Sequence, residues 1–200
     1  MAPRFKLPMG ASGITDVIEA AYKCEVESRY RQYQADTETK RNIDSVARLL
    51  ADGTGKFGLL FSGTCGNGKT TMMYAIRDVI REISRMGALD GQYAGKELIV
   101  KDAIDVVRTA ADGDMQSIVA IPLLAIDDLG KEPAEVVNYG NIINPMVELI
   151  EKRYKRQLFT LATTNLTPRQ IREKYGARMA DRFNEMFNVV IFKSESYRKT

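Results

Sequence analysis

Eight residues of this chain have the types and spacing that bind a chain of phosphates: Gly63, Thr64, Cys65, Gly66, Asn67, Gly68, Lys69 and Thr70. They follow the pattern G-x-x-x-x-G-K-[ST], whose glycines let consecutive backbone N–H groups turn toward an anion. In this pattern the lysine places a cation near the β- and γ-phosphates, and the hydroxyl residue binds Mg²⁺. We therefore expect ATP at this loop, with Thr71 as a further nucleotide contact and with Lys69 exposed in the loop.

Polar residues also end two apolar runs further along the chain. Asp127 and Asp128 follow the run 121–126, and Asn165 closes the run 158–165. Carboxylates are costly to bury unpaired, and in an α/β sheet the carboxyl ends of the strands face the ligand. We predict that Asp127 holds Mg²⁺, through its water shell or jointly with Thr70, and that Asp128 orients an attacking water. Asn165 is expected to contact the γ-phosphate or that water. A capped strand–helix junction without chemistry is the alternative.

Two arginines could supply the charge that phosphoryl transfer needs in its transition state. Arg178 and Arg182 are four residues apart in a short helix predicted over 175–183, so their side chains share one face. Such arginines often come from a neighbouring subunit. Ordinary surface ion pairs are the alternative interpretation.

The composition excludes several other chemistries. The chain has no histidine, which rules out Ser-His-Asp catalysis, Cys-His catalysis and histidine-ligated zinc. Its net charge of +3 permits a nucleic-acid partner without requiring one. The two cysteines, Cys24 and Cys65, show no pairing pattern, so we expect a cytoplasmic protein. No apolar run is long enough for a membrane helix, and no secretion signal begins the chain.

The elements that must position these residues alternate between strands and helices. Strands are predicted over 56–62, 97–101, 121–126, 158–165 and 188–192. Helices are predicted from Asp16 to Tyr33, over a stripe around 43–50 that ends at Gly53, from Lys69 to Gly87, over 102–111, over 135–155, after Thr167 and over 175–183. We expect residues 1–13 to form a loose arm. The fold class is α/β, with a five-stranded parallel sheet, right-handed crossovers and flanking helices.

Basic and aromatic residues alternate over 29–33, in the order Arg-Tyr-Arg-Gln-Tyr. This composition suits single-stranded nucleic acid. The alternative is an exposed helix end whose tyrosines pack on a neighbouring element.

Together these motifs resemble the AAA+ ATPases of the bacterial helicase-loader class, the DnaC/DnaI group with the transposition helper IstB as close kin. The resemblance is carried by the loop 63–70, by Leu-Ala-Ile-Asp-Asp-Leu-Gly over 124–130, by Leu-Ala-Thr-Thr-Asn-Leu over 161–166 and by the segment 175–183. It covers about residues 37–198. It implies a P-loop NTPase fold of AAA+ type without a C-terminal helical lid. The ATPase domain would span 37–200, and residues 1–36 would form an arm and helix that could bind a partner.

The resemblance also assigns roles to individual residues. Asn165 takes the sensor-1 role, Arg182 takes the arginine-finger position with Arg178 beside it, and Arg198 matches a further arginine near the family's C-terminus. Most AAA+ ATPases carry Glu where this chain has Asp128, whose side chain is one methylene shorter. Asp-Asp does occur in the loader class.

The function implied is slow hydrolysis of ATP with Mg²⁺, stimulated by DNA or a partner, in a homo-oligomer that forms with ATP. As a helicase loader the protein would bind single-stranded DNA and a replicative helicase. Three alternatives stay open: an IstB-like helper that binds duplex DNA and a transposase, a small P-loop kinase, and a scaffold that binds ATP without hydrolysing it.

Overall fold

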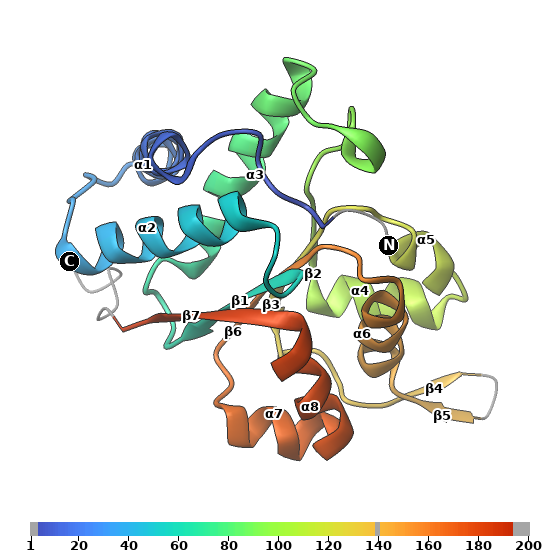
Figure 1. The fold of residues 1–200 in the computed structure, drawn as a ribbon. Helices are drawn as coiled ribbons and strands as arrows, with labels where there is room; N and C mark the ends of the chain where they lie inside the picture. The colour runs from blue at the N-terminus through green and yellow to red at the C-terminus, as the bar shows by residue number, and fades with distance from the viewer. Residues whose placement is uncertain (1–3, 139–140, 194–200) are drawn as a thin grey trace.

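A computed structural model describes residues 4–138 and 141–193 of the chain. Its centre is a parallel five-stranded sheet in the order β2-β3-β6-β1-β7 (Figure 1). The strands are β1 (Gly58–Gly63), β2 (Ile99–Asp102), β3 (Leu124–Leu129), β6 (Thr160–Thr164) and β7 (Phe187–Phe192). The predicted α/β class and the five parallel strands are confirmed. Since all five strands run the same way, their carboxyl ends meet at one edge of the sheet.

Helices cover both faces of the sheet and enclose a separate apolar core on each side. The first face carries α1 (Ala11–Glu27), α2 (Thr37–Asp52) and α3 (Lys69–Arg85), and the short 3₁₀ helix η1 (Gly91–Tyr93) follows α3. The second face carries α4 (Ala103–Ala111), α5 (Met115–Val119), α6 (Pro145–Arg156), α7 (Pro168–Tyr175) and α8 (Ala177–Met186). In Figure 1, α1 lies above α2 and beside α3, away from the strands.

Several helix boundaries follow from local capping chemistry. The Asp102 carboxylate accepts a hydrogen bond from the Ile104 backbone N–H at 2.8 Å and so begins α4. Thr167 and Gln170 form a reciprocal capping box at the start of α7, with Pro168 in its first turn. Gly53 ends α2 with a left-handed backbone (φ 61°). These three boundaries lie where the sequence predicts them.

Residues 4–13 are not a loose arm, which corrects the prediction for this part of the range 1–13; residues 1–3 lie outside the described residues. The Phe5 ring is buried, 5.1 Å from the Tyr93 ring and 4.7 Å from the Phe159 ring. The Leu7 backbone N–H donates to the Leu50 carbonyl at 2.8 Å. The helix that follows the arm begins at Ala11 rather than at Asp16. Apolar burial of about 1.5–3 kcal/mol per large side chain outweighs the local turn signals.

The long helix predicted over 135–155 is also wrong. The segment forms an antiparallel hairpin of β4 (Val136–Asn138) and β5 (Asn141–Ile143), followed by α6. Asn144 caps α6 through a 3.1 Å hydrogen bond from the Val147 N–H, and Pro145 occupies the first turn. Proline cannot sit inside a helix, and β-branched residues on either side of the turn favour strands.

The N-terminal helix belongs to the same core as its neighbours. Ile14, Ile18 and Tyr22 of α1 are buried among apolar residues of α2 and α3. The division into residues 1–36 and 37–200 stays a prediction. No helix in the part of the chain that the structure describes has the length and apolar character needed to cross a bilayer.

Candidate nucleotide-binding site

The predicted phosphate loop joins β1 to α3 at the carboxyl edge of the sheet. Gly63 begins it with a φ of 153°, and a Cβ there would lie 2.3 Å from the Phe192 carbonyl oxygen and 2.5 Å from Asn67 Nδ2. Only glycine fits this position without displacing the neighbouring strand. Asn67 Nδ2 donates to the same Phe192 carbonyl at 2.7 Å and so fixes the loop to the end of β7.

Lys69 lies inside the loop rather than exposed in it, contrary to the prediction. Lys69 is only 5% exposed. Nζ donates to the carbonyls of Gly63 at 2.8 Å and Thr64 at 2.6 Å, and to Asn67 Oδ1 at 2.9 Å. The curvature of the loop brings these acceptors around the ammonium, which a linear pattern does not show. The cation is thereby held within the concavity formed by the loop.

Asp127 joins the loop to the neighbouring strands through side-chain hydrogen bonds. Thr70 Oγ1 donates to Asp127 Oδ1 at 3.0 Å, and Thr163 Oγ1 donates to the same oxygen at 2.5 Å. The three residues come from α3, β3 and β6, which are far apart in sequence. The carboxylate and hydroxyl predicted to hold Mg²⁺ thus lie within hydrogen-bonding distance of each other.

A bulge in β3 aims the two acidic residues differently. Ile126 pairs with Ala162 and Leu129 pairs with Thr164, so two residues of β3 lie opposite Thr163 alone. Asp128 takes the left-handed conformation (φ 56°), and its backbone N–H donates to Thr163 Oγ1 at 2.9 Å. Its carboxylate pairs with Lys131, and this hydrogen bond raises the pKa of the Lys131 ammonium. The register shift allows Asp127 to face α3 while Asp128 faces the following loop.

Asn165 directly follows β6 at the same sheet edge. Its Oδ1 is buried and has no hydrogen-bond partner among the described residues. A buried polar atom without a partner is costly and is expected where a ligand or water completes the site. As an acceptor at the sheet edge, this oxygen fits the predicted contact with an attacking water, whose O–H can donate to it.

The residues present fit a nucleotide with Mg²⁺. No group of three or more acidic, thiol or imidazole residues that could hold a metal occurs within 4–138 and 141–193. Thr70 and Asp127 would therefore hold Mg²⁺ together with phosphate oxygens and water, as Mg²⁺ commonly binds at phosphate sites. When bound, the ion would neutralise phosphate charge.

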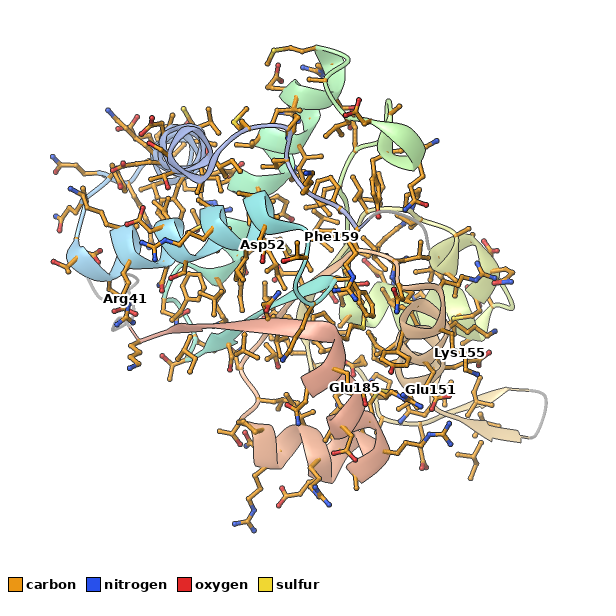
Figure 2. All side chains as sticks on the ribbon, in the orientation of Figure 1. Arg41, Asp52, Glu151, Lys155, Phe159 and Glu185 are labelled. Carbon is orange, nitrogen blue, oxygen red and sulfur yellow. The ribbon has the colours of Figure 1, made fainter. Side chains whose placement is uncertain are left out.

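The structure does not bring Arg178 and Arg182 to the phosphate loop of their own chain. Arg182 lies 4.3 Å over the Tyr154 ring, which is itself 6.1 Å from the ring of Phe57, the residue before β1. The loop begins at the other end of β1, about 17 Å along the strand. Arg178 Nε pairs with Glu151 of α6 at 3.3 Å, and its side chain is 74% exposed. In Figure 2, Glu151 and Glu185 lie toward the end of β7 opposite Arg41. Arg198 lies outside the described residues.

Sequence reasoning missed a buried carboxylate close to the acidic pair. Glu132 is 1% exposed; its Oε2 accepts from the Gly130 N–H at 2.8 Å and its Oε1 accepts from the Tyr175 hydroxyl. Lys174 Nζ donates to the Gly130 carbonyl at 2.9 Å. Burial, and then Glu132, raises the pKa of the Tyr175 hydroxyl, which keeps it a donor. This cluster ties the loop after Asp128 to the junction of α7 and α8. A single acid in a polar loop gave no signal of this role.

Thr163 is a second residue of this site that the sequence patterns did not predict. Two threonines at the end of a buried strand were the available signal, because a hydroxyl there needs a partner.

Within residues 29–33, one tyrosine packs on a neighbouring element and the other is exposed, as a nucleic-acid contact would be. The Tyr33 ring packs 6.0 Å from the Tyr22 ring, and its hydroxyl donates to Glu19 at 3.0 Å. The Tyr30 side chain is fully exposed. Binding of single-stranded DNA by this segment stays a prediction.

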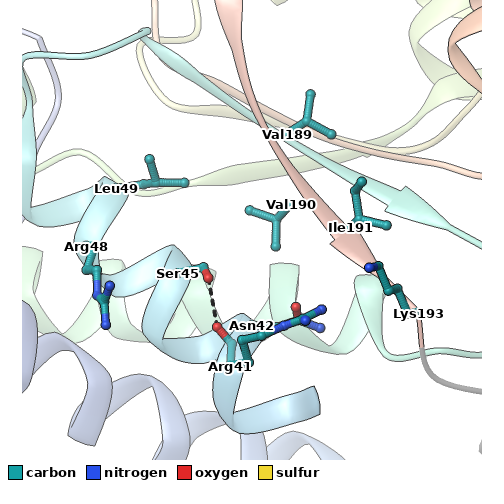
Figure 3. Close-up of a pocket in the computed structure, with 9 residues that line it drawn as sticks. All are labelled: Arg41, Asn42, Ser45, Arg48, Leu49, Val189, Val190, Ile191 and Lys193. Carbon is teal, nitrogen blue, oxygen red and sulfur yellow. Dashed lines mark hydrogen bonds between the residues drawn. The ribbon is translucent and has the colours of Figure 1, made fainter. Parts of the chain in front are cut away.

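A groove beside the edge strand β7 contains none of the predicted site residues (Figure 3). It is lined by Arg41, Asn42, Ser45, Arg48 and Leu49 of α2 and by Val189, Val190, Ile191 and Lys193.

Solved structures of replication proteins are similar to this one. The DnaC helicase loader aligns with a TM-score of 0.62 and 20% identity, over 80% of this chain and 93% of that one. DnaI aligns with a TM-score of 0.58 and 20% identity, over 80% and 87% of the two chains. AMPPCP-bound DnaA from Aquifex aeolicus aligns with a TM-score of 0.56 and 16% identity, over 83% of this chain and 50% of DnaA. No protein-family model matches the sequence, and no curated protein is similar to it.

The chain has the AAA+ fold of these proteins. The resemblance predicted from the motifs is confirmed at the level of the fold. The phosphate loop, the acidic pair and Asn165 lie at one edge of this AAA+ sheet.

Proposed function

We propose that this chain is an ATP-binding and ATP-hydrolysing accessory protein of DNA replication that acts as a helicase loader. The observation that carries the proposal is the hydrogen-bonded set Thr70, Asp127 and Thr163 beside the enclosed Lys69. It lies in a fold shared with the DnaC helicase loader and DnaI. Its partners would be single-stranded DNA and a replicative helicase.

In the proposed mechanism, the loop amides and Lys69 hold the phosphate chain, and Lys69 exchanges its carbonyl acceptors for phosphate oxygens. Asp128 orients the attacking water after release from Lys131, and Asn165 donates to the γ-phosphate or accepts from that water. Positioning and charge neutralisation supply most of the catalysis in phosphoryl transfer, so histidine is not required.

Arg182, with Arg178 beside it, would act on a neighbouring subunit in an ATP-dependent homo-oligomer. The position of Arg182 at the opposite edge of the sheet from its own loop supports an action between subunits. The adjacent subunit would present its phosphate loop to this surface.

The direct test measures MgATP binding and phosphate release by the purified protein, with and without single-stranded DNA. We expect slow turnover that rises when DNA is added. Absence of both ATP binding and DNA binding would overturn the proposal. Phosphate transfer to a small acceptor would indicate a kinase instead.

An affinity pull-down from the native cell in the presence of ATP tests the partner. Recovery of a replicative helicase supports the loader function. Recovery of a transposase, together with a preference for duplex DNA, would favour the transposition helper.

A further inference from the structure

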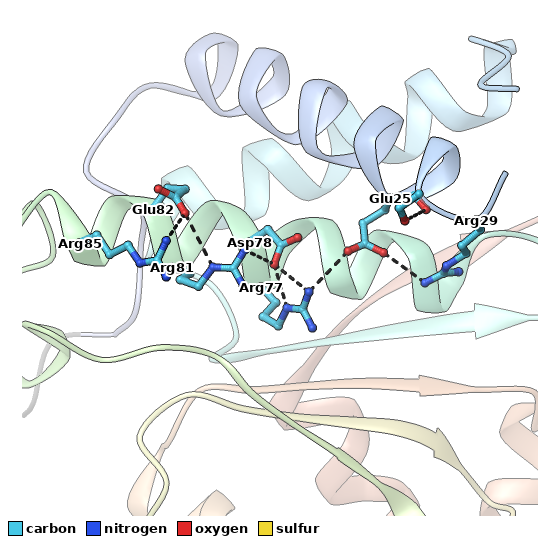
Figure 4. A network of polar contacts seen from close by, with 8 residues as sticks. Glu25, Arg29, Arg77, Asp78, Arg81, Glu82 and Arg85 are labelled. Atoms are coloured by element: carbon cyan, nitrogen blue, oxygen red, sulfur yellow. Dashed lines mark hydrogen bonds and ion pairs between the residues drawn. The ribbon is translucent and has the colours of Figure 1, made fainter. Parts of the chain in front are cut away.

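A network of charged residues connects the end of α1 to the middle and last turns of α3 (Figure 4). Arg29 lies two residues after α1 and donates from Nη1 to the Thr71 hydroxyl at 3.1 Å. Its Nη2 pairs with a Glu25 carboxylate oxygen at 3.2 Å. One arginine thus links the N-terminal helix to the turn that follows the phosphate loop.

The position of Thr71 makes this contact notable. Thr71 is the third residue of α3, so its backbone N–H is among those that the helix leaves without an internal partner. These N–H groups and the helix dipole face the loop and attract an anion. The guanidinium that touches Thr71 is therefore placed at the phosphate-binding end of α3, and its side chain is 42% exposed.

The other charged and polar side chains of the proposed site are expected to contact the β- and γ-phosphates and the metal, at the end of the phosphate chain away from the ribose. Lys69 is expected at the β- and γ-phosphates, and Thr70 with Asp127 at the metal. The phosphate next to the ribose has no side-chain cation among them. Arg29 approaches from α1, on the first face of the sheet, whereas Asp127 approaches α3 from β3.

The present partner of Arg29 can be exchanged. Glu25 is shared, because Arg77 also reaches its carboxylate at 3.5 Å while pairing with Asp78 at 2.8 Å. Burial raises the pKa of Glu25 in spite of Arg29, so the carboxylate is not fully compensated by its cations. If Arg29 moved away, Arg77 would remain beside Glu25 as its cation.

We propose that Arg29 is a nucleotide-binding residue supplied by the N-terminal helix, which exchanges Glu25 for the phosphate adjacent to the ribose. The inference rests on the proposed nucleotide site. By thermodynamic reciprocity, a nucleotide that holds Arg29 also fixes the end of α1, and a partner that fixes this segment strengthens nucleotide binding.

Isothermal titration calorimetry with MgATP and MgADP tests the contact. We expect Arg29→Met to weaken both nucleotides about tenfold, because each carries the phosphate in question and a charge-assisted hydrogen bond is lost. Arg29→Lys should restore part of the affinity. The matched control is Arg85→Met in the last turn of α3, where Arg85 pairs with Glu82 at 3.0 Å, and it should bind as the parent does.

Glu25→Gln separates a nucleotide contact from a purely structural role. It removes the competing carboxylate, so we expect MgADP affinity to rise about twofold to fivefold. Weaker binding in both Glu25→Gln and Arg29→Met would mean that the pair only stabilises α1, and would overturn the inference. Unchanged affinity in Arg29→Met would overturn it as well, while the proposed function would stand. A parent protein that binds neither nucleotide would instead overturn the proposed function.

Discussion

The carboxyl edge of the sheet and the surface of α8 differ in how their functional side chains are held. At the carboxyl edge, Asp127 is hydrogen-bonded by Thr70 and Thr163 from two other elements. On α8, Arg182 stacks on Tyr154 and pairs loosely with Glu185 at 3.7 Å, while Arg178 is mostly exposed. Exposed ion pairs contribute only about 0–1 kcal/mol each.

This difference shows that the fold completes only part of the proposed catalytic apparatus within one chain. The phosphate end is preorganised by buried and part-buried hydrogen bonds, whereas the arginines can exchange their partners at little cost. An arrangement of this kind suits arginines that act on a second molecule.

The largest effect is expected at the preorganised end. Lys69→Ala should abolish ATP binding, because the loop loses its only lysine and its contact with the β- and γ-phosphates. Calorimetry measures the loss. Since Lys69 is buried, a thermal melt must show that the variant folds, and hydrolysis at the parental rate would contradict the site assignment.

Arg182→Ala should spare ATP binding and lower turnover roughly 10³-fold, the magnitude typical of an arginine finger. Steady-state phosphate release measures it. Mixing this variant with the Lys69→Ala protein should restore some activity, since the Lys69→Ala subunit still supplies Arg182 to the intact ATP site of its Arg182→Ala neighbour. No recovery at any mixing ratio would argue against action between subunits.

Glu132 connects the two regions, and its removal tests that connection. Glu132→Ala should lower the free energy of unfolding by about 3 kcal/mol, because the Gly130 N–H, the Tyr175 hydroxyl and Lys174 lose a buried partner. Glu132→Gln is the matched control and should cost less than about 1 kcal/mol, since its oxygen can accept from the Gly130 N–H while its NH2 group donates to the Tyr175 oxygen. Urea unfolding compares them; equal losses would show that the hydrogen bonds are not what stabilises the loop.

Thr163→Val should lower turnover about tenfold at unchanged ATP affinity, because Asp127 and the Asp128 N–H lose a shared hydroxyl. Thr163→Ser keeps the hydroxyl and should retain most of the activity. A valine variant with parental turnover would show that the bulge holds the acids without this bond.

The smallest effect is expected for Arg178→Ala, a decrease in turnover of about twofold to fivefold with ATP affinity unchanged. Its side chain is exposed and its single ion pair with Glu151 is weak. A loss as large as that of Arg182→Ala would show that the two arginines act together.

The sequence by itself determined the parts that depend on local chemistry. The glycine pattern fixed the loop, Asp102 and Thr167 fixed helix starts, and apolar runs ended by acids fixed which strands carry the site. Each of these signals lies within a few residues, where periodicity and capping operate.

Only the tertiary structure decided which way the side chains of the site point and which groups they contact. The bulge that separates Asp127 from Asp128 depends on the register between β3 and β6, and the enclosure of Lys69 depends on the curvature of the loop. Glu132 and Arg29 find partners 43 and 42 residues away along the chain. Such pairings form because buried polar groups must find partners wherever packing brings them, and sequence spacing does not encode that proximity.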